Sequence, residues 1–357
     1  MRKTTPVMAI SGGSADPSSA GPNAAGPNAA GPSFACPRSI ARTIGALLTA
    51  FGLLASLSAC VSSSAAAGCE PTVLAGPASK LISVSGAFGE APKVKFPTPL
   101  YSVGTQVSLI SAGTGPVITT GQPLAIFATV YNARSGKVLQ QMQYGDSVGS
   151  IMTVQKKSVW AVSAALECLR VGSRVAVISS ANQSHAGETS DENGLEANDS
   201  LIYVFDLKQA YLTRANGVPQ VPRNGSPTVV TTDAGRPGIT MPTLPSPKKL
   251  GIEVLKRGSG NRVKAGGFAL VKYTALGWED KTVFDTSWET NEPAILTLDG
   301  KGETTGLVQG ILGQRVGSQL ILSVPADLAT GGSPGSGGTP PAGQAVLYVV
   351  DILGADG

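Results

Sequence analysis

"GLVQGILGQRVGSQLILSV", residues 306–324, joins a helical pattern to a strand through a short glycine turn. Its apolar residues between Leu307 and Leu312 fall at i, i+1, i+4 and i+5, which is the spacing of one helix face. The apolar run after the turn has the length and composition of a buried strand. The stretch therefore predicts one short helix packed against a sheet.

A second stretch, "VWAVSAALECLRVGSRVAVIS" at residues 159–179, repeats the letters RVGS between a helical pattern and an apolar strand. Ser158 precedes it as a plausible N-cap. "TVYNARSGKVLQQ" at 129–141 and "TALGWEDKTVFDT" at 274–286 each indicate a strand, a polar turn and a second strand. Each half thus predicts about five strands and one short helix. We expect an α+β fold made of two duplicated domains, each an antiparallel sheet packed on its helix.

Composition divides the chain into five segments, with boundaries at Pro-rich, Ser/Ala-rich and apolar stretches. We expect a disordered extension and signal peptide at 1–59, a modified Cys with its tether at 60–99, a first domain at 100–213, an extended Pro-rich linker at 214–249 and a second domain at 250–357.

The stretch "ARTIGALLTAFGLLASLSAC", residues 41–60, has the features of an export signal: Arg42, an apolar run and then small residues. A membrane-spanning helix needs about 20 mostly apolar residues, and the run from Ile44 to Ala59 is shorter than that. A permanent transmembrane anchor is therefore the weaker interpretation. The final "LSAC" resembles the lipobox of bacterial lipoproteins. This resemblance implies that Cys60 is lipidated and holds the protein at the extracytoplasmic face of the cell membrane.

Export changes the expected chemistry of the cysteines. Cys36 is removed with the signal and Cys60 is lipidated, which leaves Cys69 and Cys168 of the four cysteines. Pairing is favoured in an oxidising compartment, so we expect a disulfide between them. Two free buried thiols are the alternative.

Charge argues against nucleic acid as a partner. The chain has 27 basic and 23 acidic residues, and residues 1–59 hold four of the former and one of the latter, so the rest carries a net charge of only +1 (23 − 22). No basic stripe remains to neutralise phosphates. The single histidine, His185, lies in a hydrophilic run, which argues against a Ser-His-Asp triad or a multi-His metal site. We expect neither a metal nor a cofactor.

Phe284 and Asp285 stand side by side at the end of a predicted strand. An aspartate beside an apolar ring is costly to bury unless a partner satisfies it. The pair therefore either terminates the strand or forms one wall of a site.

Three ordered stretches decide between these interpretations: "GGFALVKYTALGWEDKTVFDTSW" at 266–288, "GLVQGILGQRVGSQLILSVPADLATG" at 306–331 and "TPPAGQAVLYVVDIL" at 339–353. Together they make residues 250–354 resemble the FKBP-type peptidyl-prolyl cis-trans isomerases. The resemblance implies a half-barrel sheet wrapped on the helix, with an aromatic pocket between them. It also implies isomerisation of X-Pro bonds in unfolded or envelope proteins without a nucleophile or metal.

The resemblance places Tyr273, Phe284, Asp285 and Tyr348 on catalytic pocket positions, and Leu307 where many members have the Trp of the pocket floor. It implies that Asp285 is held by a neighbouring hydroxyl, such as that of Tyr273.

The same resemblance places Thr304, Thr330 and Pro341 on the pocket rim. Thr330 stands where the family has a Tyr, Ala294 replaces a pocket Phe, and Glu303-Thr304 replace a Val-Ile pair. These departures favour an alternative function, a non-catalytic chaperone or binding lipoprotein with the same fold. A receptor for transported ligands has less support, because no hinge-linked α/β lobes are indicated.

The first half has the same order of strands and turns as the second half but lacks its candidate catalytic residues. Ala128 falls where Tyr273 does, and Leu139-Gln140 fall where Phe284-Asp285 do. We expect a degenerate copy of the second domain, serving packing or client holding. The expected partners are proline-containing clients and, through the lipid, the membrane, with the protein itself a monomer.

Overall fold

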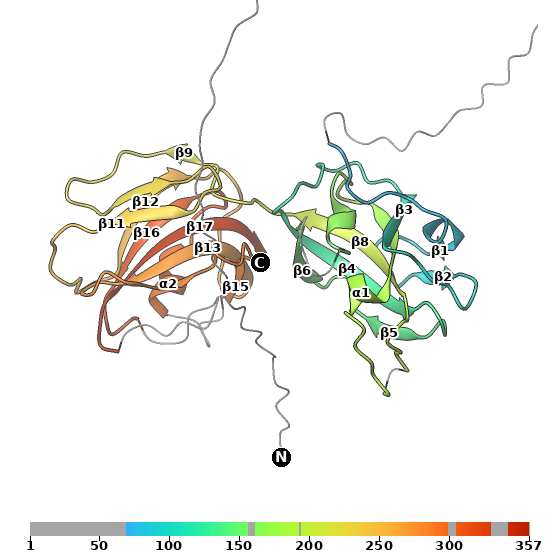
Figure 1. Ribbon diagram of the computed structural model, residues 1–357. Helices are drawn as coiled ribbons and strands as arrows, with labels where there is room; N and C mark the ends of the chain where they lie inside the picture. Colours follow the sequence, from blue (N-terminus) through green and yellow to red (C-terminus); the bar gives the residue numbers. More distant parts are fainter. Residues whose placement is uncertain (1–68, 156–160, 193, 299–304, 330–341, 357) are drawn as a thin grey trace, which may run out of the picture. The chain divides into compact units, whose positions relative to one another are not determined.

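The computed structural model describes residues 69–155, 161–192, 194–298, 305–329 and 342–356. These residues build two large antiparallel sheets, two separate two-stranded hairpins and few helices (Figure 1). This confirms the expected class of antiparallel sheets with few helices. We call residues 69–210 the N-terminal domain and residues 211–356 the C-terminal domain.

The N-terminal domain is mostly strand. Its sheet has the order β3-β7-β8-β4-β5, and β6 pairs with β4. In chain order its elements are η1 (Ser79–Leu81), β1 (Ser83–Ser85), β2 (Lys93–Lys95), β3 (Thr105–Ser111), β4 (Pro123–Asn132), β5 (Val138–Gln141), β6 (Ser150–Thr153), η2 (Ala164–Leu166), β7 (Arg174–Ser179), α1 (Ala181–Ser184) and β8 (Leu201–Ala210).

The C-terminal domain repeats this arrangement and adds a strand. Its sheet has the order β14-β13-β17-β16-β12-β9, and β15 pairs with β13. In chain order its elements are β9 (Val218–Pro219), β10 (Thr228–Thr231), β11 (Pro237–Thr240), β12 (Gly251–Arg257), β13 (Phe268–Gly277), β14 (Val283–Thr286), β15 (Ala294–Thr297), α2 (Thr305–Ile311), β16 (Gln319–Val324) and β17 (Val346–Asp356).

The two domains share their strand registers at a constant shift of 145 residues (228 − 83). Ser83 pairs with Lys95 in the first hairpin, and Thr228 pairs with Thr240 in the second. The same shift relates the positions at which the strand registers slip. In the N-terminal sheet these positions are Leu109/Ser111, Ala125/Ile126 and Val130/Tyr131. In the C-terminal sheet they are Val254/Lys256, Leu270/Val271 and Ala275/Leu276. Each domain therefore uses the same backbone frame.

The repeated RVGS letters have one structural role in both domains. The hydroxyl of Ser173 accepts the Gly113 N–H at 2.8 Å, and that of Ser318 accepts the Gly258 N–H at 3.0 Å. A Cβ at Gly258 would lie 2.2 Å from the carbonyl oxygen of Val316. Only glycine allows the two backbones to approach this closely, so the motif fixes the loop before the helix against the turn after it.

The Pro-rich stretch at 214–249 differs from the extended linker expected for it. β9 pairs with β12, and β10 pairs with β11. Side chains of this stretch cover the outer face of the C-terminal sheet: Val229, Ile239 and Met241 pack against a cluster that holds Trp278 and Leu347. Alternating apolar residues in a proline-rich segment were enough to form a hairpin once a sheet face was available to bury them.

The expected tether at 60–99 is likewise folded over its described part. η1 and the β1–β2 hairpin lie in it, and Ala78, Ile82 and Val94 pack on the outer face of the N-terminal sheet against residues such as Ile178 and Val204. Each domain thus begins with a lead segment of about 30 to 40 residues that covers one face of its own sheet.

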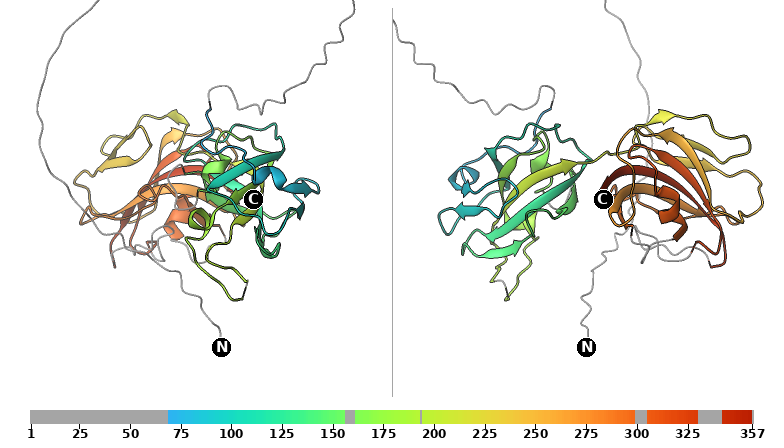
Figure 2. Two further views of the ribbon diagram at one scale, coloured as in Figure 1. Left: turned by 45° about the vertical axis from the view of Figure 1, so that its right-hand side comes forward. Right: turned by 180° about the vertical axis from the view of Figure 1, so that it is seen from behind.

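The helix of the C-terminal domain agrees with its sequence pattern. Leu307, Val308 and Ile311 of α2 are buried on one face against the inner side of the sheet, which curves around the helix (Figure 2). The N-terminal domain differs, because over its described part the expected helix is only the 3-10 turn η2. Glu167 is extended and Cys168 has φ of 66°, a backbone conformation that stops a helix.

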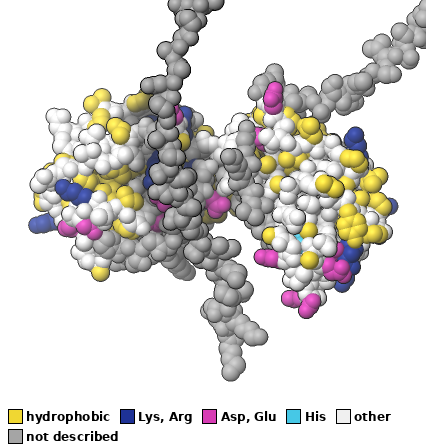
Figure 3. All heavy atoms as spheres, in the orientation of Figure 1, with side chains coloured by type: hydrophobic (Ala, Val, Ile, Leu, Met, Phe, Trp, Pro, Cys, Tyr) yellow, Lys and Arg dark blue, Asp and Glu magenta, His cyan; other side chains and the backbone are white. Residues whose placement is uncertain are grey.

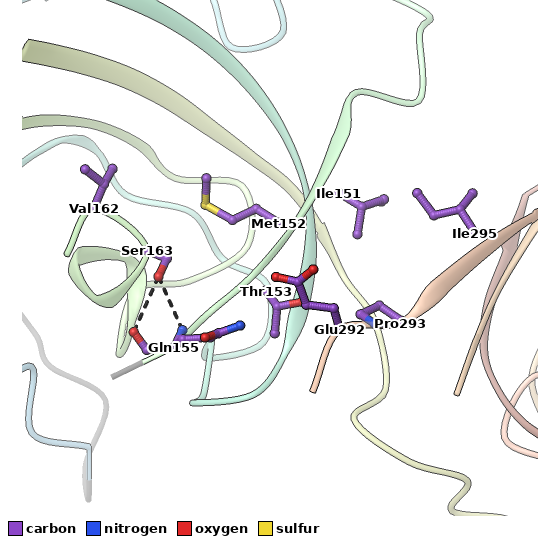
Figure 4. A pocket seen from close by; sticks show the side chains of 9 residues that line it. All are labelled: Ile151, Met152, Thr153, Gln155, Val162, Ser163, Glu292, Pro293 and Ile295. Atoms are coloured by element: carbon purple, nitrogen blue, oxygen red, sulfur yellow. Dashed lines mark hydrogen bonds between the residues drawn. The ribbon is translucent and has the colours of Figure 1, made fainter. Parts of the chain in front are cut away.

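The predicted disulfide between Cys69 and Cys168 is present, with the two Cα atoms 5.6 Å apart. It attaches the start of the lead segment to the residue that follows η2. Close by, the hydroxyl of Ser163 bonds to the backbone of Gln155 at 3.4 Å (Figure 4). Val162 and Met152 of the same region pack on the inner core of the N-terminal domain.

Candidate functional site

The aspartate beside the aromatic ring has its partner. Asp285 on β14 is 3% exposed, and its Oδ2 accepts a hydrogen bond from the hydroxyl of Tyr273 on β13. A buried carboxylate is stable only with such hydrogen bonds. The hydroxyl of Tyr273, which the resemblance suggested as this partner, is thus in contact with Asp285.

Hydroxyl groups fix the two strands that carry this pair. The Tyr273 N–H donates to the Ser287 hydroxyl at 2.9 Å, and the Ser287 N–H donates to the Tyr273 carbonyl at 3.1 Å. The hydroxyls of Thr274 and Thr286 lie 3.0 Å apart. These contacts set the end of β14 against the middle of β13. Sequence reasoning overlooked Ser287, although the letters "TSW" directly after Asp285 supply the hydroxyls that a strand end can use.

Two other elements contribute buried side chains to the core beside this pair. Leu307 on α2 and Tyr348 on β17 are both fully buried in the core that contains Tyr273. The rings of Tyr273 and Tyr348 have centroids 6.2 Å apart at an interplanar angle of 59°, within the range of favourable aromatic pairs. Three of the predicted side chains therefore meet on the inner face of the sheet.

The remaining predicted site residues are Phe284, Ala294 and the three rim residues. Phe284 is partly exposed and packs against the edge of the same core. Ala294 is 5% exposed in this core, so it contributes only a methyl group where a larger ring would project. Thr304, Thr330 and Pro341 lie outside the described residues.

The opposite face of β13 carries a buried charge that the sequence analysis did not consider. Lys272 is 2% exposed, its Nζ donates to the Asn291 side chain at 2.6 Å, and it pairs across the sheet with Asp351. Burial lowers the pKa of Lys272, while the Asp351 carboxylate opposes that shift. Burial also raises the pKa of Asp351. The sequence could have indicated this buried charge, because Lys272 is a single lysine inside the apolar run "ALVKYTA".

The N-terminal domain places other side chains on the same frame. Gln140 pairs with Val130 where Asp285 pairs with Ala275, so Gln140 stands in the register of Asp285. Ala128 is 2% exposed at the position of Tyr273, and it lacks the hydroxyl that holds the carboxylate. Burial raises the pKa of Tyr203, the counterpart of Tyr348. The acid–hydroxyl pair is therefore confined to the C-terminal domain.

Within the described residues, no helix is both long and apolar enough to cross a membrane. Within the same ranges, no group of three or more His, Cys, Asp or Glu side chains could hold a metal ion.

Comparison with known proteins agrees with this geometry. A family profile described as "FKBP-type peptidyl-prolyl cis-trans isomerase" matches residues 260–353. A probable FK506-binding protein of Corynebacterium glutamicum is 30% identical over 120 residues, covering 34% of this chain and 98% of that protein. An FK506-binding protein of Streptomyces anulatus is 29% identical over 118 residues, 33% of this chain and 95% of that protein. The structure of the three FKBP domains of wheat FKBP73 shares 18% identity and covers 71% of this chain and 95% of its own, and its TM-score of 0.31 adds no weight.

Proposed function

This chain belongs to the FKBP-type peptidyl-prolyl cis-trans isomerase family, and on that premise we propose that its C-terminal domain isomerises X-Pro bonds in unfolded, exported proteins. The observation that carries the proposal is the buried Tyr273–Asp285 hydrogen bond beside the rings of Phe284 and Tyr348. This arrangement supplies a carboxylate wall and aromatic surface in one place, without a nucleophile.

The chemistry needs only an environment that prefers the twisted amide. Rotation about the X-Pro bond breaks amide resonance, and the barrier is about 18–20 kcal/mol. A dry aromatic surface favours the twisted imide, which has less charge separation, over the planar ground state. Phe284 supplies that surface from the end of β14, where it is partly exposed, and it packs against the core that holds the buried rings of Tyr273 and Tyr348. Asp285 has a fixed position because Tyr273 and its own strand hold it.

The test is an isomerisation assay on the full chain with a short proline peptide. Uncatalysed exchange takes tens to hundreds of seconds, so acceleration by micromolar protein is readily measured. We expect acceleration by the unaltered protein and at least a tenfold lower rate for Phe284→Ala. A rate no higher than the uncatalysed rate for the unaltered protein would refute the enzymatic proposal.

We also propose that the protein acts as a monomer, lipid-anchored through Cys60 on the extracytoplasmic side of the membrane. The "LSAC" sequence supports the anchor, and the Cys69–Cys168 disulfide supports an oxidising compartment. Labelled palmitate supplied to expressing bacteria should enter the unaltered protein and not Cys60→Ser. Equal labelling of the two proteins, or none in either, would reject lipidation at this residue.

A second function has its own support. Ala294 and Leu307 leave less aromatic surface around the candidate pocket, and the N-terminal domain carries Ala128 and Gln140 at the catalytic positions. These features favour a chaperone that holds proline-containing clients without turnover. That function predicts suppressed aggregation of an unfolded client by a protein that gives no isomerase rate.

A further inference from the structure

The two sheets end differently at one edge. β3 is the terminal strand of the described N-terminal sheet, whereas β9 pairs with β12, the counterpart of β3, in the C-terminal sheet. The pairing joins Lys256 to Pro219 and Arg257 to Val218, and the Gln220 N–H donates to the Leu255 carbonyl at 2.8 Å. At the shift of 145 residues, the matching edge in the N-terminal domain is Ile110–Ala112. Over the described residues, the sheet has no strand beyond this edge.

The disulfide explains why the N-terminal lead segment leaves this edge open. The segment meets β3 at Leu74, whose carbonyl accepts the Val107 N–H at 3.1 Å. Five residues earlier, Cys69 is bonded to Cys168 beside η2. The chain therefore runs toward the inner side of the domain instead of along the strand. In the C-terminal domain the equivalent residues stay on the edge as β9.

An apolar groove lies where the segment departs. It has a volume of about 140 Å³. Most of the side chains that line it are apolar, among them Pro71, Val73, Leu74, Val107, Leu109 and Leu169, and Glu167 also lines it. Leu74 is 66% exposed and Leu109 is 45% exposed. Hydrophobic side chains also gather on the side of the domain that carries β1, β2 and β3 (Figure 3).

The strand itself lacks the charges that normally protect an edge. β3 reads "TQVSLIS" and has no charged residue, whereas β12 reads "GIEVLKR". Exposed sheet edges are usually blocked by charge, proline or a covering segment, because their free N–H and C=O groups recruit another strand. Downstream of Val107, β3 has neither charge nor proline, and within the described residues no strand pairs with its outer edge. The covered edge of the sister domain shows what fits the position: an extended, uncharged segment in which Val218 and Pro219 form the pairs.

We propose that the β3 edge and its groove bind an extended, uncharged stretch of an unfolded client polypeptide as an added antiparallel strand. Backbone hydrogen bonds to Leu109 and the residues after it hold the stretch, and its apolar side chains enter the groove. This surface lies on the N-terminal domain and does not depend on isomerase activity. It supplies a holding site on the domain that lacks the Tyr–Asp pair.

The test uses the sequence of the covering strand as its probe. A fluorescein-labelled peptide with the sequence of residues 216–221, NGVPQV, is titrated with the full chain and followed by fluorescence anisotropy. Binding should weaken at least tenfold for Leu109→Lys. It should not change for Val138→Lys, a matched control because Val138 is 51% exposed on the opposite edge of the same sheet.

A second probe needs no variant protein. The same peptide, N-methylated at the alternate residues whose N–H groups would face β3, cannot donate backbone hydrogen bonds to that strand, so its affinity for the unaltered chain should also fall at least tenfold. Equal binding of the methylated peptide, or of the plain peptide to Leu109→Lys, would overturn the proposal. So would a dimer of the unaltered chain that Leu109→Lys dissociates, because a second copy would then be the occupant.

The isomerase assay separates this proposal from the proposed function. Leu109→Lys should leave the rate on a short proline peptide unchanged. A chain with no isomerase rate that still binds the probe through Leu109 would refute the enzymatic proposal and support the edge site.

Discussion

The N-terminal and C-terminal domains share one backbone frame and differ in what they place on it. Their strand irregularities recur at a constant shift, as at Val130/Tyr131 and Ala275/Leu276. On the inner face, one domain has Tyr273 and Asp285 where the other has alanine and glutamine. The frame depends on backbone hydrogen bonds and glycine turns, which tolerate many side chains. The hydrogen-bonded pair depends on two particular side chains, and alanine and glutamine at the same positions cannot form it.

On the outer face of each sheet, a buried aspartate binds the backbone of the lead segment. Asp206 accepts the Gly89 N–H at 2.7 Å, and Asp351 accepts the Ala215 N–H at 2.8 Å. Both carboxylates are buried, and each holds the lead segment of its own domain. Arg174 is bonded to Asp206, whereas the cation opposite Asp351 is Lys272, on another strand. In each domain a cation on a neighbouring strand lies opposite the buried carboxylate, and the strand that carries it differs.

The largest expected effect comes from removing the lead segment of the C-terminal domain. A chain that begins at residue 250 loses β9 to β11 and exposes the apolar face around Trp278, Ile321 and Leu347. At about 25 cal/mol per Å² of apolar surface, we expect a loss of at least ~5 kcal/mol, which is comparable to the stability of a whole domain. Urea unfolding should show little or no cooperative transition.

The matched control for this truncation begins at residue 211 and keeps the lead segment. It should unfold cooperatively. Equal urea midpoints for the two chains would mean that residues 214–249 only connect the domains, and the comparison of the two lead segments would fail.

Removal of the disulfide should affect one domain alone. Cys69 and Cys168 are 99 residues apart, and the chain-entropy estimate for a loop of this size is about 4–5 kcal/mol. The double variant Cys69→Ser/Cys168→Ser should therefore lower the unfolding free energy of the N-terminal domain by about 4 kcal/mol. Hydrogen exchange should show the change in β3 to β8 and not in β12 to β17. Equal loss of protection in both domains would contradict the independence of the two frames.

Changes at the candidate site should affect activity more than folding. Phe284→Ala should reduce kcat/KM on a proline peptide at least tenfold, about 1.4 kcal/mol, with little loss of stability because Phe284 is partly exposed. Asp285→Ala should have a similar effect, and Tyr273→Phe a smaller one, since only a hydroxyl is removed. Leu139→Ala, at the position of Phe284 in the other domain, is the control and should leave the rate unchanged.

The smallest expected effect is a difference in pH dependence. The pKa of Lys272 is lowered by burial, so near its ordinary pKa the unfolded state binds more protons than the folded state. The unfolding free energy of the C-terminal domain should therefore rise as pH increases from 8 to 10, by less than about 1 kcal/mol. The pKa of Arg174 is raised instead by its hydrogen bond to Asp206, so this pair should give the N-terminal domain no rise in unfolding free energy between pH 8 and 10.

Lys272→Met is the control for that prediction. It should remove the rise between pH 8 and 10 in the C-terminal domain. A rise of the same size in this variant would assign the pH dependence to other groups.

Local patterns in the sequence were sufficient for the elements of the C-terminal domain. The 3.6-residue period around Leu307 predicted α2, and the order of strands and turns predicted an antiparallel sheet. The expected alignment of Gln140 with Asp285 agrees with the strand registers. Such predictions succeed because hydrophobic period and turn residues act over a few neighbouring positions. The expected helix of the N-terminal domain is only the 3-10 turn η2 over the described residues, although Cys168 and its counterpart Gly313 both adopt the left-handed conformation that ends a helix.

By itself, the sequence determined the antiparallel class with few helices, and it predicted the repeat, the aromatic and acidic residues of the candidate site and the cysteine pair. Only the tertiary structure decided that residues 214–249 cover a sheet, that Lys272 and Asp351 pair across neighbouring strands, and that the first lead segment packs on the sheet that β3 borders. The physical reason is the distance along the chain between the residues that interact. A helix face or a turn depends on neighbouring residues in the sequence. The burial of a proline-rich strand or of a lysine depends instead on surfaces that the fold brings together from distant positions.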